Sequence, residues 1–96
     1  MDFAKPGDNF GKQKVYYTNA RLNGQTALLA GPFLTAAEAE ACLDTVGPIF
    51  VDDEPASRMA SFGVMQCNAP GPGNGRYNHL LPEKLKMAVA LGFRLN

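Results

Sequence analysis

The stretch from residue 26 to residue 50, TALLAGPFLTAAEAEACLDTVGPIF, constrains the fold more than any other part of the chain. Residues 26–30 are predicted to form a strand, and the unbroken apolar run over residues 27–30 is typical of a strand that is buried on both faces or lies at the centre of a sheet. Gly31-Pro32 is expected to end this strand, because proline cannot donate a hydrogen bond to a neighbouring strand. A helix signal follows at once, so the stretch predicts a strand, a turn and a helix in succession.

Thr35 and Glu38 have the spacing of a capping box, in which the threonine accepts a hydrogen bond from a helical N–H and the glutamate reaches back to the cap. Apolar residues then recur at helical spacing, namely Ala39, Cys42, Leu43, Val46, Ile49 and Phe50. Pro48 lies inside this pattern, where a proline costs roughly 3 kcal/mol. The helix either ends near Val46 or continues with a kink to about residue 52. We favour the kinked helix, because the periodicity continues past the proline.

Strand signals lie on both sides of this unit. Residues 14–21, KVYYTNAR, are rich in β-branched and aromatic side chains, as a strand should be. Asn23-Gly24 is a strong signal for a two-residue hairpin turn, because both positions of that turn need positive φ. Alternation over residues 58–67 predicts a third strand, with Ala60, Phe62 and Val64 on one face and Met59, Ser61, Gly63 and Met65 on the other.

A second helix is predicted near the C-terminus, with Pro82 at its first position and Gly92 as the residue that ends it. Its apolar stripe consists of Leu81, Leu85, Ala88 and Val89. The sequence thus predicts one α+β domain over residues 14–96, in the order β-β-α-β-α. Its three-stranded antiparallel sheet carries two helices on one face. Residues 1–13 hold few large apolar groups and are interpreted as a mobile leader.

The composition is typical of a globular protein with one domain, and it argues against a membrane-spanning or secreted protein. Ninety-six residues with a hydrophobic fraction of 46% suffice for one core. No apolar run approaches the roughly 20 residues needed to cross a bilayer, and the N-terminus lacks the apolar part of a signal peptide. We therefore expect a cytoplasmic protein. Cys42 and Cys67 have neither a metal-site spacing nor a CxxC spacing, and both are predicted to be reduced and largely buried.

Charge is unevenly distributed along a chain whose formal net charge is zero. Asp52, Asp53 and Glu54 fall at the end of the predicted helix, where the helix dipole disfavours carboxylates. The plain interpretation is a solvated acidic loop that is partly offset by Arg58. The alternative is an acidic surface that meets a basic surface of another protein. The acids lack the spacing of an EF-hand, and neither a metal nor a cofactor is predicted.

Residues 68–79, NAPGPGNGRYNH, form the longest loop signal, and loops of this length are usually functional or disordered. The loop lacks the GxxxxGK[ST] pattern of a phosphate-binding loop, and Pro72 removes an N–H that would be needed there. Arg76 and Tyr77 are candidate partner-binding residues, because both types are common at interfaces. His79 is the only histidine, so any histidine general base must be this residue, but the sequence places no serine or cysteine nucleophile near it. We predict no catalytic residue.

One motif consists of Leu28-Leu29-Ala30-Gly31-Pro32-Phe33, Thr35 and Glu38-Ala39. It resembles a motif of small proteins from bacteriophages and other bacterial mobile elements, in which a hairpin, a GPF turn and a helix precede a strand with a Phe-Gly pair, here Phe62-Gly63. The resemblance covers residues 15–65, departs at Gly47-Pro48, and implies a fold and a genomic setting but no catalytic residue. The motif is also similar, more weakly, to half of a SPOR peptidoglycan-binding domain, whose second βα half is missing here.

The favoured hypothesis is a small non-enzymatic accessory protein of a phage or mobile element that binds a bacterial host protein complex. Its most concrete form is an anti-CRISPR-like antagonist of host defence. The candidate partner-binding residues are Asp52, Asp53, Glu54, Arg76 and Tyr77. One alternative is a nucleic-acid-binding module that uses Lys12, Lys14, Arg58, Arg76 and Tyr77, although the zero net charge does not favour it. The other alternative is a small enzyme that uses His79. The oligomeric state is not predicted.

Overall fold

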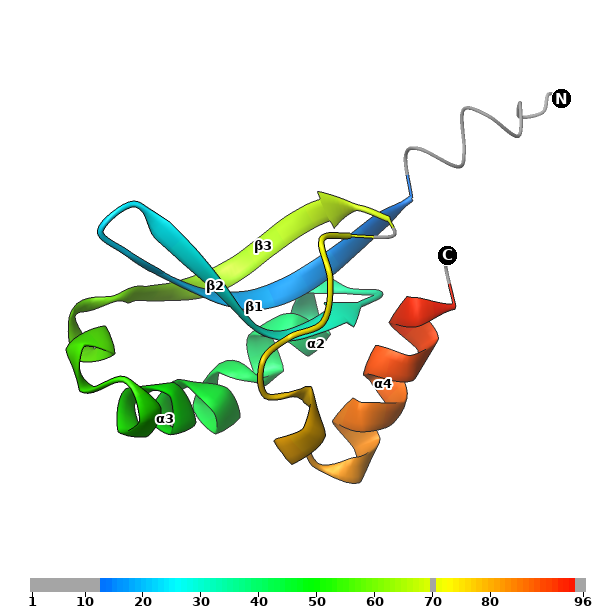
Figure 1. Ribbon diagram of the computed structural model, residues 1–96. Coiled ribbons are helices and arrows are strands. Elements are labelled where there is room, and N and C mark those ends of the chain that lie inside the picture. The colour runs from blue at the N-terminus through cyan, green and yellow to red at the C-terminus, as the bar shows by residue number, and fades with distance from the viewer. Residues whose placement is uncertain (1–12, 70, 95–96) are drawn as a thin grey trace, which may run out of the picture.

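The computed structural model describes residues 13–69 and 71–94 (Figure 1). Its elements are β1 (Lys14–Leu22), β2 (Gln25–Phe33), α2 (Ala36–Ala41), α3 (Leu43–Asp53), the 3-10 helix η1 (Pro55–Met59), β3 (Ser61–Asn68), the 3-10 helix η2 (Asn78–Leu80) and α4 (Glu83–Phe93). The strands form one antiparallel sheet in the order β2-β1-β3. The predicted α+β fold is therefore confirmed. The predicted mobile leader lies outside the described residues, apart from residue 13.

The hairpin forms as predicted, with positive φ at Asn23 and Gly24. Its second strand, β2, is an edge strand rather than the central one, because β1 pairs with both neighbours. The expectation that Gly31-Pro32 ends this strand is wrong, since β2 continues to Phe33 across a cis Gly31-Pro32 bond. An edge strand tolerates a proline, because only one side of it must pair within the sheet. The β1–β2 register shifts on either side of Thr18.

The predicted helix does pass through Pro48 to Asp53, but it is interrupted at Cys42, which separates α2 from α3. The Ala39 carbonyl would accept the Leu43 N–H in an uninterrupted helix. Here it accepts hydrogen bonds from the Thr18 hydroxyl of β1 at 2.5 Å and from the Cys42 N–H at 3.2 Å. The break thus lies where a strand contacts the helix. Half of the predicted capping box forms, with the Thr35 hydroxyl accepting the Glu38 N–H at 3.2 Å. The other half is wrong, because the buried Oε1 of Glu38 has no hydrogen-bond partner among the described residues.

The third strand begins at Ser61, three residues later than predicted, because Pro55–Met59 forms η1. Pro55 opens that 3-10 helix, a position where its missing N–H costs little. Residues opposite each other in an antiparallel pair share a face. Phe62 and Val64 lie opposite Ala20 and Thr18 on the face where α2 and α3 pack, which agrees with the predicted alternation.

The core lies between this face of the sheet and the helices (Figure 1). Its fully buried members include Leu29, Phe33, Ala39, Cys42 and Val46. Both cysteines are free thiols, as predicted, with Cys42 buried and Cys67 half-buried. Of the predicted apolar stripe, Ala88 and Val89 are buried within α4, and Leu81 is buried just before it. Pro82 is the residue before the helix rather than its first residue.

Gly92 lies within α4 and does not end it, so its predicted role as the terminating residue is wrong. A Cβ at this position would lie 2.2 Å from the carbonyl oxygen of Pro32. The glycine is needed because α4 packs directly against the backbone of β2. In the described part of the chain, no helix has the length and apolar character that crossing a bilayer requires.

Candidate functional site

The long loop lies along the outer edge of β2, and we call residues 71–77 the strap. The N–H groups of Gly75, Arg76 and Tyr77 donate to the carbonyls of Gly31, Leu28 and Leu29 at 3.1, 2.8 and 2.8 Å. A Cβ on Gly75 would lie 2.3 Å from the Cα of Ala30, so only glycine allows this close approach. The described part of the loop is thus a structural element that covers a strand edge.

Two side chains hold the strap at its ends. The Asn78 side chain forms two hydrogen bonds with Gly31, accepting from its N–H at 2.9 Å and donating to its carbonyl at 2.7 Å. The buried Tyr17 donates its hydroxyl proton to the Gly73 carbonyl at 2.6 Å. These bonds place the backbone of Arg76 and Tyr77 relative to the sheet.

Tyr77 joins the strap to the end of α3. Its hydroxyl donates to Oδ2 of Asp53 at 2.6 Å, and its ring lies 6.4 Å from the ring of Phe50. The Arg76 guanidinium lies over the same Phe50 ring, 5.2 Å from the centroid, and 6.0 Å from that of Tyr77. We call Phe50, Asp53, Glu54, Arg76 and Tyr77 the Phe50 cluster. Two segments proposed separately from the sequence therefore meet in space.

The members of the cluster differ in exposure. Tyr77 is only 3% exposed and Phe50 7%, whereas Asp53, Glu54 and Arg76 are exposed. Burial and the neighbouring Asp53 carboxylate raise the pKa of the Tyr77 hydroxyl, while Arg76 lowers it. Tyr77 is therefore not a surface contact, and it can act on a partner only through the positions of Asp53 and Arg76. Asp52 is exposed at the end of α3.

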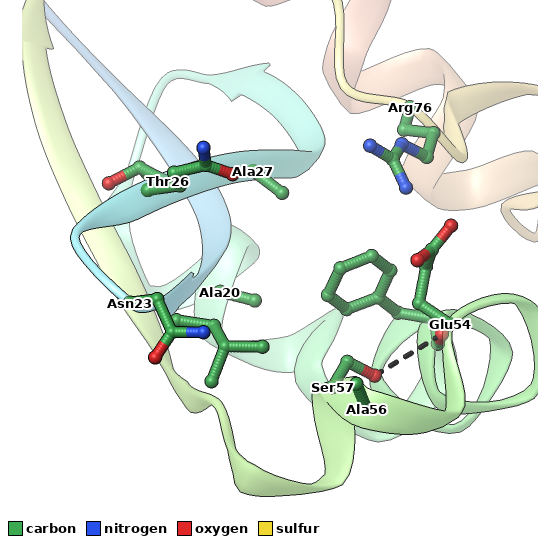
Figure 2. Close-up of a pocket in the computed structure, with 11 residues that line it drawn as sticks. Ala20, Asn23, Thr26, Ala27, Glu54, Ala56, Ser57 and Arg76 are labelled. Carbon is green, nitrogen blue, oxygen red and sulfur yellow. Dashed lines mark hydrogen bonds between the residues drawn. The ribbon is translucent and has the colours of Figure 1, made fainter.

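A groove of about 410 Å³ opens between the cluster and the β-hairpin, and we call it the hairpin groove. Its lining residues are Ala20, Leu22, Asn23, Gln25, Thr26, Ala27, Phe50, Glu54, Ala56, Ser57 and Arg76. Figure 2 shows Arg76 and Glu54 on one side, pointing toward each other, with Asn23 and Thr26 across the groove. The Ser57 hydroxyl donates to the Phe50 carbonyl at 3.3 Å, which ties η1 to α3.

The groove can hold an amphipathic group. Phe50 and the alanines supply apolar surface, and the guanidinium of Arg76 and the carboxylate of Glu54 bring opposite charges to one rim. Pockets of this size with a few convergent polar groups are typical of binding sites. The sequence did not indicate the hairpin residues as part of a site, because Asn23 and Thr26 are fully explained by turn and strand requirements.

The basic residues of the nucleic-acid alternative do not form one patch. Lys14 pairs with Asn68 at one end of β3, and its ammonium donates to the Asn68 side chain. Arg58 lies in η1, just before the other end of that strand. Seven strand steps separate the two ends, or about 23 Å. Lys12 lies outside the described residues.

His79 is exposed in η2 and does not line the hairpin groove. It lines a hollow with Asn74, Gly75, Asn78, Lys86, Val89 and Phe93. Among the described residues that line this hollow, none is a serine or cysteine that the imidazole could activate, and none is a carboxylate that could orient it. Within residues 13–69 and 71–94, no group of His, Cys, Asp and Glu side chains is arranged to hold a metal ion.

Comparisons of the chain with protein-family models, with curated proteins and with solved structures found no match. Function must therefore be argued from the geometry of the Phe50 cluster and the hairpin groove.

Proposed function

We propose that the protein is a non-enzymatic accessory protein of a phage or mobile element that binds a bacterial protein complex at the Phe50 cluster and the hairpin groove. The observation that carries this proposal is the hydrogen bond between Tyr77 and Asp53, which are 24 residues apart. It brings the acidic end of α3 and the Arg76 guanidinium to the rim of one open groove.

Preorganisation supports a binding role. The guanidinium of Arg76 lies against two aromatic rings, and Asp53 is held by a buried hydroxyl group. Side chains that are already ordered lose less conformational entropy on binding, so more of the contact energy becomes affinity. Arginine beside aromatic surface is also the residue pattern of interface hot spots.

The charges define the chemistry of the partner. Asp52 and Glu54 favour lysine or arginine on the partner, and Arg76 favours a carboxylate. The apolar floor at Phe50 favours a large side chain that enters the groove between these charges. A protein surface offers such a mixed pattern, whereas the uniformly anionic backbone of a nucleic acid does not. In its most concrete form, the partner is a host-defence complex that the protein inhibits, as an anti-CRISPR does.

Reversing the acidic charges tests the proposal. We expect the triple variant Asp52→Lys, Asp53→Lys, Glu54→Lys to lose the partner that the tagged wild-type chain captures from a nuclease-treated bacterial lysate. Capture is measured by quantitative mass spectrometry of the eluted proteins. The matched control is Glu40→Lys, because Glu40 is exposed on α2, outside the cluster. Circular dichroism establishes that both variants are folded.

Two results would contradict the proposal. Equal capture by the triple variant would exclude the acidic surface as the binding site. Capture that disappears on nuclease treatment would show that nucleic acid bridges the interaction, in favour of the nucleic-acid alternative. Salt adds a further check, because an interface with exposed charges should weaken as ionic strength rises.

A further inference from the structure

The two edge strands of the sheet, β2 and β3, differ in whether their outer backbone groups are hydrogen-bonded. The outer edge of β2 is covered by the strap, through three hydrogen bonds from Gly75, Arg76 and Tyr77. The outer edge of β3 receives no strand from the described residues, because β3 is the last strand of the order β2-β1-β3 (Figure 1). An unpaired edge presents a row of N–H and C=O groups that can pair with another chain.

The hydrogen-bond pattern between β1 and β3 identifies which backbone N–H and C=O groups of β3 face away from the sheet. The N–H of Ala69 donates to the carbonyl of Gln13 at 2.7 Å, one pair beyond Lys14 and Asn68. Hydrogen-bonded pairs alternate along an antiparallel ladder, so the odd-numbered residues of β3 bond to β1. The even-numbered residues Phe62, Val64 and Gln66 therefore direct their N–H and C=O groups away from the sheet.

The composition of β3 lacks the usual protection of an edge. Natural edge strands carry lysine, proline or an inward-pointing charge that prevents pairing with other chains. Residues 61–68, SFGVMQCN, contain no charged residue and no proline. Phe62 and Val64 remain 36% and 37% exposed beside this edge, and Met59 just before it is 82% exposed.

We propose that β3 pairs with β3 of a second copy of this chain, which joins two sheets into one across a two-fold axis. In the register centred on Val64, this residue lies opposite Val64 of the second copy, and Phe62 lies opposite Gln66. Both pairs use the outward-facing backbone groups. Because residues 61–68 carry no charge, the two paired strands place no like charges opposite each other.

The strap explains why β3 pairs with β3 of another copy rather than with its β2. It also explains why association stops at a dimer. A head-to-tail pairing of β3 with β2 would generate an open-ended filament, since each added copy would present a new edge. The strap occupies this edge of β2 over residues 28–31. A two-fold pairing of β3 with itself closes instead. The two ends of the joined sheet are then β2 edges, which the strap covers at residues 28–31.

Sedimentation equilibrium of the full chain over a range of concentrations tests this pairing. We expect a reversible monomer-dimer equilibrium for the wild type and loss of the dimer in Val64→Lys, which places two ammonium groups opposite each other. The control is Ala90→Lys, at an exposed position of α4, which should dimerise as the wild type does. Circular dichroism and thermal melts of each variant separate lost pairing from lost folding.

Mixing complementary variants tests the two-fold register directly. Val64→Lys and Val64→Glu should each be monomeric, and an equal mixture should recover the dimer, because opposite charges then face each other. Amide exchange adds a readout at single residues. The N–H groups of Phe62, Val64 and Gln66 should gain protection as concentration rises, while those of Gly63 and Met65 stay protected throughout.

Three results would overturn the proposal. A wild-type chain that is monomeric at every concentration would exclude a second copy as the partner of this edge. A dimer that persists in folded Val64→Lys would place the interface elsewhere. Growth beyond the dimer would show that the strap does not block β2. None of these measurements uses a bacterial partner, so they are independent of the proposed function.

Discussion

At the scale of single residues, Tyr77 has the most informative position. Its ring is buried against Phe50, yet its hydroxyl reaches an exposed carboxylate on another element. A buried tyrosine needs a partner for its hydroxyl, and here that partner is Asp53. This hydrogen bond gives the hydroxyl of the buried tyrosine a partner, and it also orders the Asp53 side chain beside the hairpin groove.

Tyr77→Phe should therefore lower the free energy of unfolding by about 1 kcal/mol, because it removes one hydrogen bond to a carboxylate that water can still solvate. Urea denaturation measures the change. Tyr16→Phe is the matched control. Its hydroxyl accepts from exposed Gln66 at 3.1 Å, and its loss should cost clearly less. Equal effects of the two substitutions would mean that the Tyr77 contact contributes no more than a surface bond. Partner capture should also fall in Tyr77→Phe but not in Tyr16→Phe.

Cys42 predicts a dependence of stability on pH. Burial raises the pKa of its thiol from 9.0 to about 11, although the Thr18 hydrogen bond lowers it. The unfolded chain loses this proton near the lower value and the folded chain near the higher one. The stabilisation from this group is thus complete below the unfolded pKa, and it is lost as pH rises through the folded pKa.

We expect the free energy of unfolding of the wild type to fall more steeply across this interval than that of Cys42→Ala. The variant should start about 1 kcal/mol less stable at neutral pH, because a buried group is removed. Urea denaturation at a series of pH values measures both slopes. Parallel slopes would show that the thiol keeps an ordinary pKa in the folded protein.

At the scale of elements, close contacts between backbones decide the arrangement. The break between α2 and α3 lies where Thr18 bonds to the Ala39 carbonyl, and α4 approaches β2 at Gly92. In both cases contact with a strand outweighs a local preference of the sequence. The first preference is for an unbroken helix through Cys42, and the second is for a helix that ends at Gly92. The strap follows the same pattern, since Gly75 allows it to lie against Ala30.

Gly92→Ala distinguishes local preference from packing. By helix propensity alone the substitution should stabilise the protein by about 1 kcal/mol. Because the new Cβ would lie 2.2 Å from the Pro32 carbonyl oxygen, we expect destabilisation by about 1–3 kcal/mol instead. Thermal unfolding measures the sign. Ala90→Gly, at an exposed position of the same helix, controls for propensity and should cost about 1 kcal/mol. A more stable Gly92→Ala would show that α4 can move away from β2.

At the scale of the whole molecule, the two proposed surfaces belong to different edges of the sheet. The hairpin groove lies between the β1–β2 hairpin, α3 and η1, with Arg76 contributed by the strap (Figure 2). The free edge is β3, on the other side of β1. A dimer formed through β3 would therefore leave both grooves available, and a partner with two sites would be bound with higher avidity.

Much of the fold could be predicted from local patterns. Asn23-Gly24 predicted the hairpin turn, Thr35 predicted the helix start, and periodicity past Pro48 predicted a helix to about residue 52. These features depend on backbone sterics and on side-chain spacing within a few residues, so they can be read along the chain. Candidate residues for binding were also recognisable by type, as acids at a helix end and as an Arg-Tyr pair in a loop.

What the tertiary structure alone decided are the contacts between segments far apart in sequence. The acids and the Arg-Tyr pair were separate candidates until the strap brought Tyr77 to Asp53. The interruption at Cys42 and the role of Gly92 likewise depend on a strand that local preference cannot locate. The sequence by itself determined the order of the main strands and helices, because their preferences are local. Only the tertiary structure decided which elements meet, because packing and hydrogen bonding act across the whole chain.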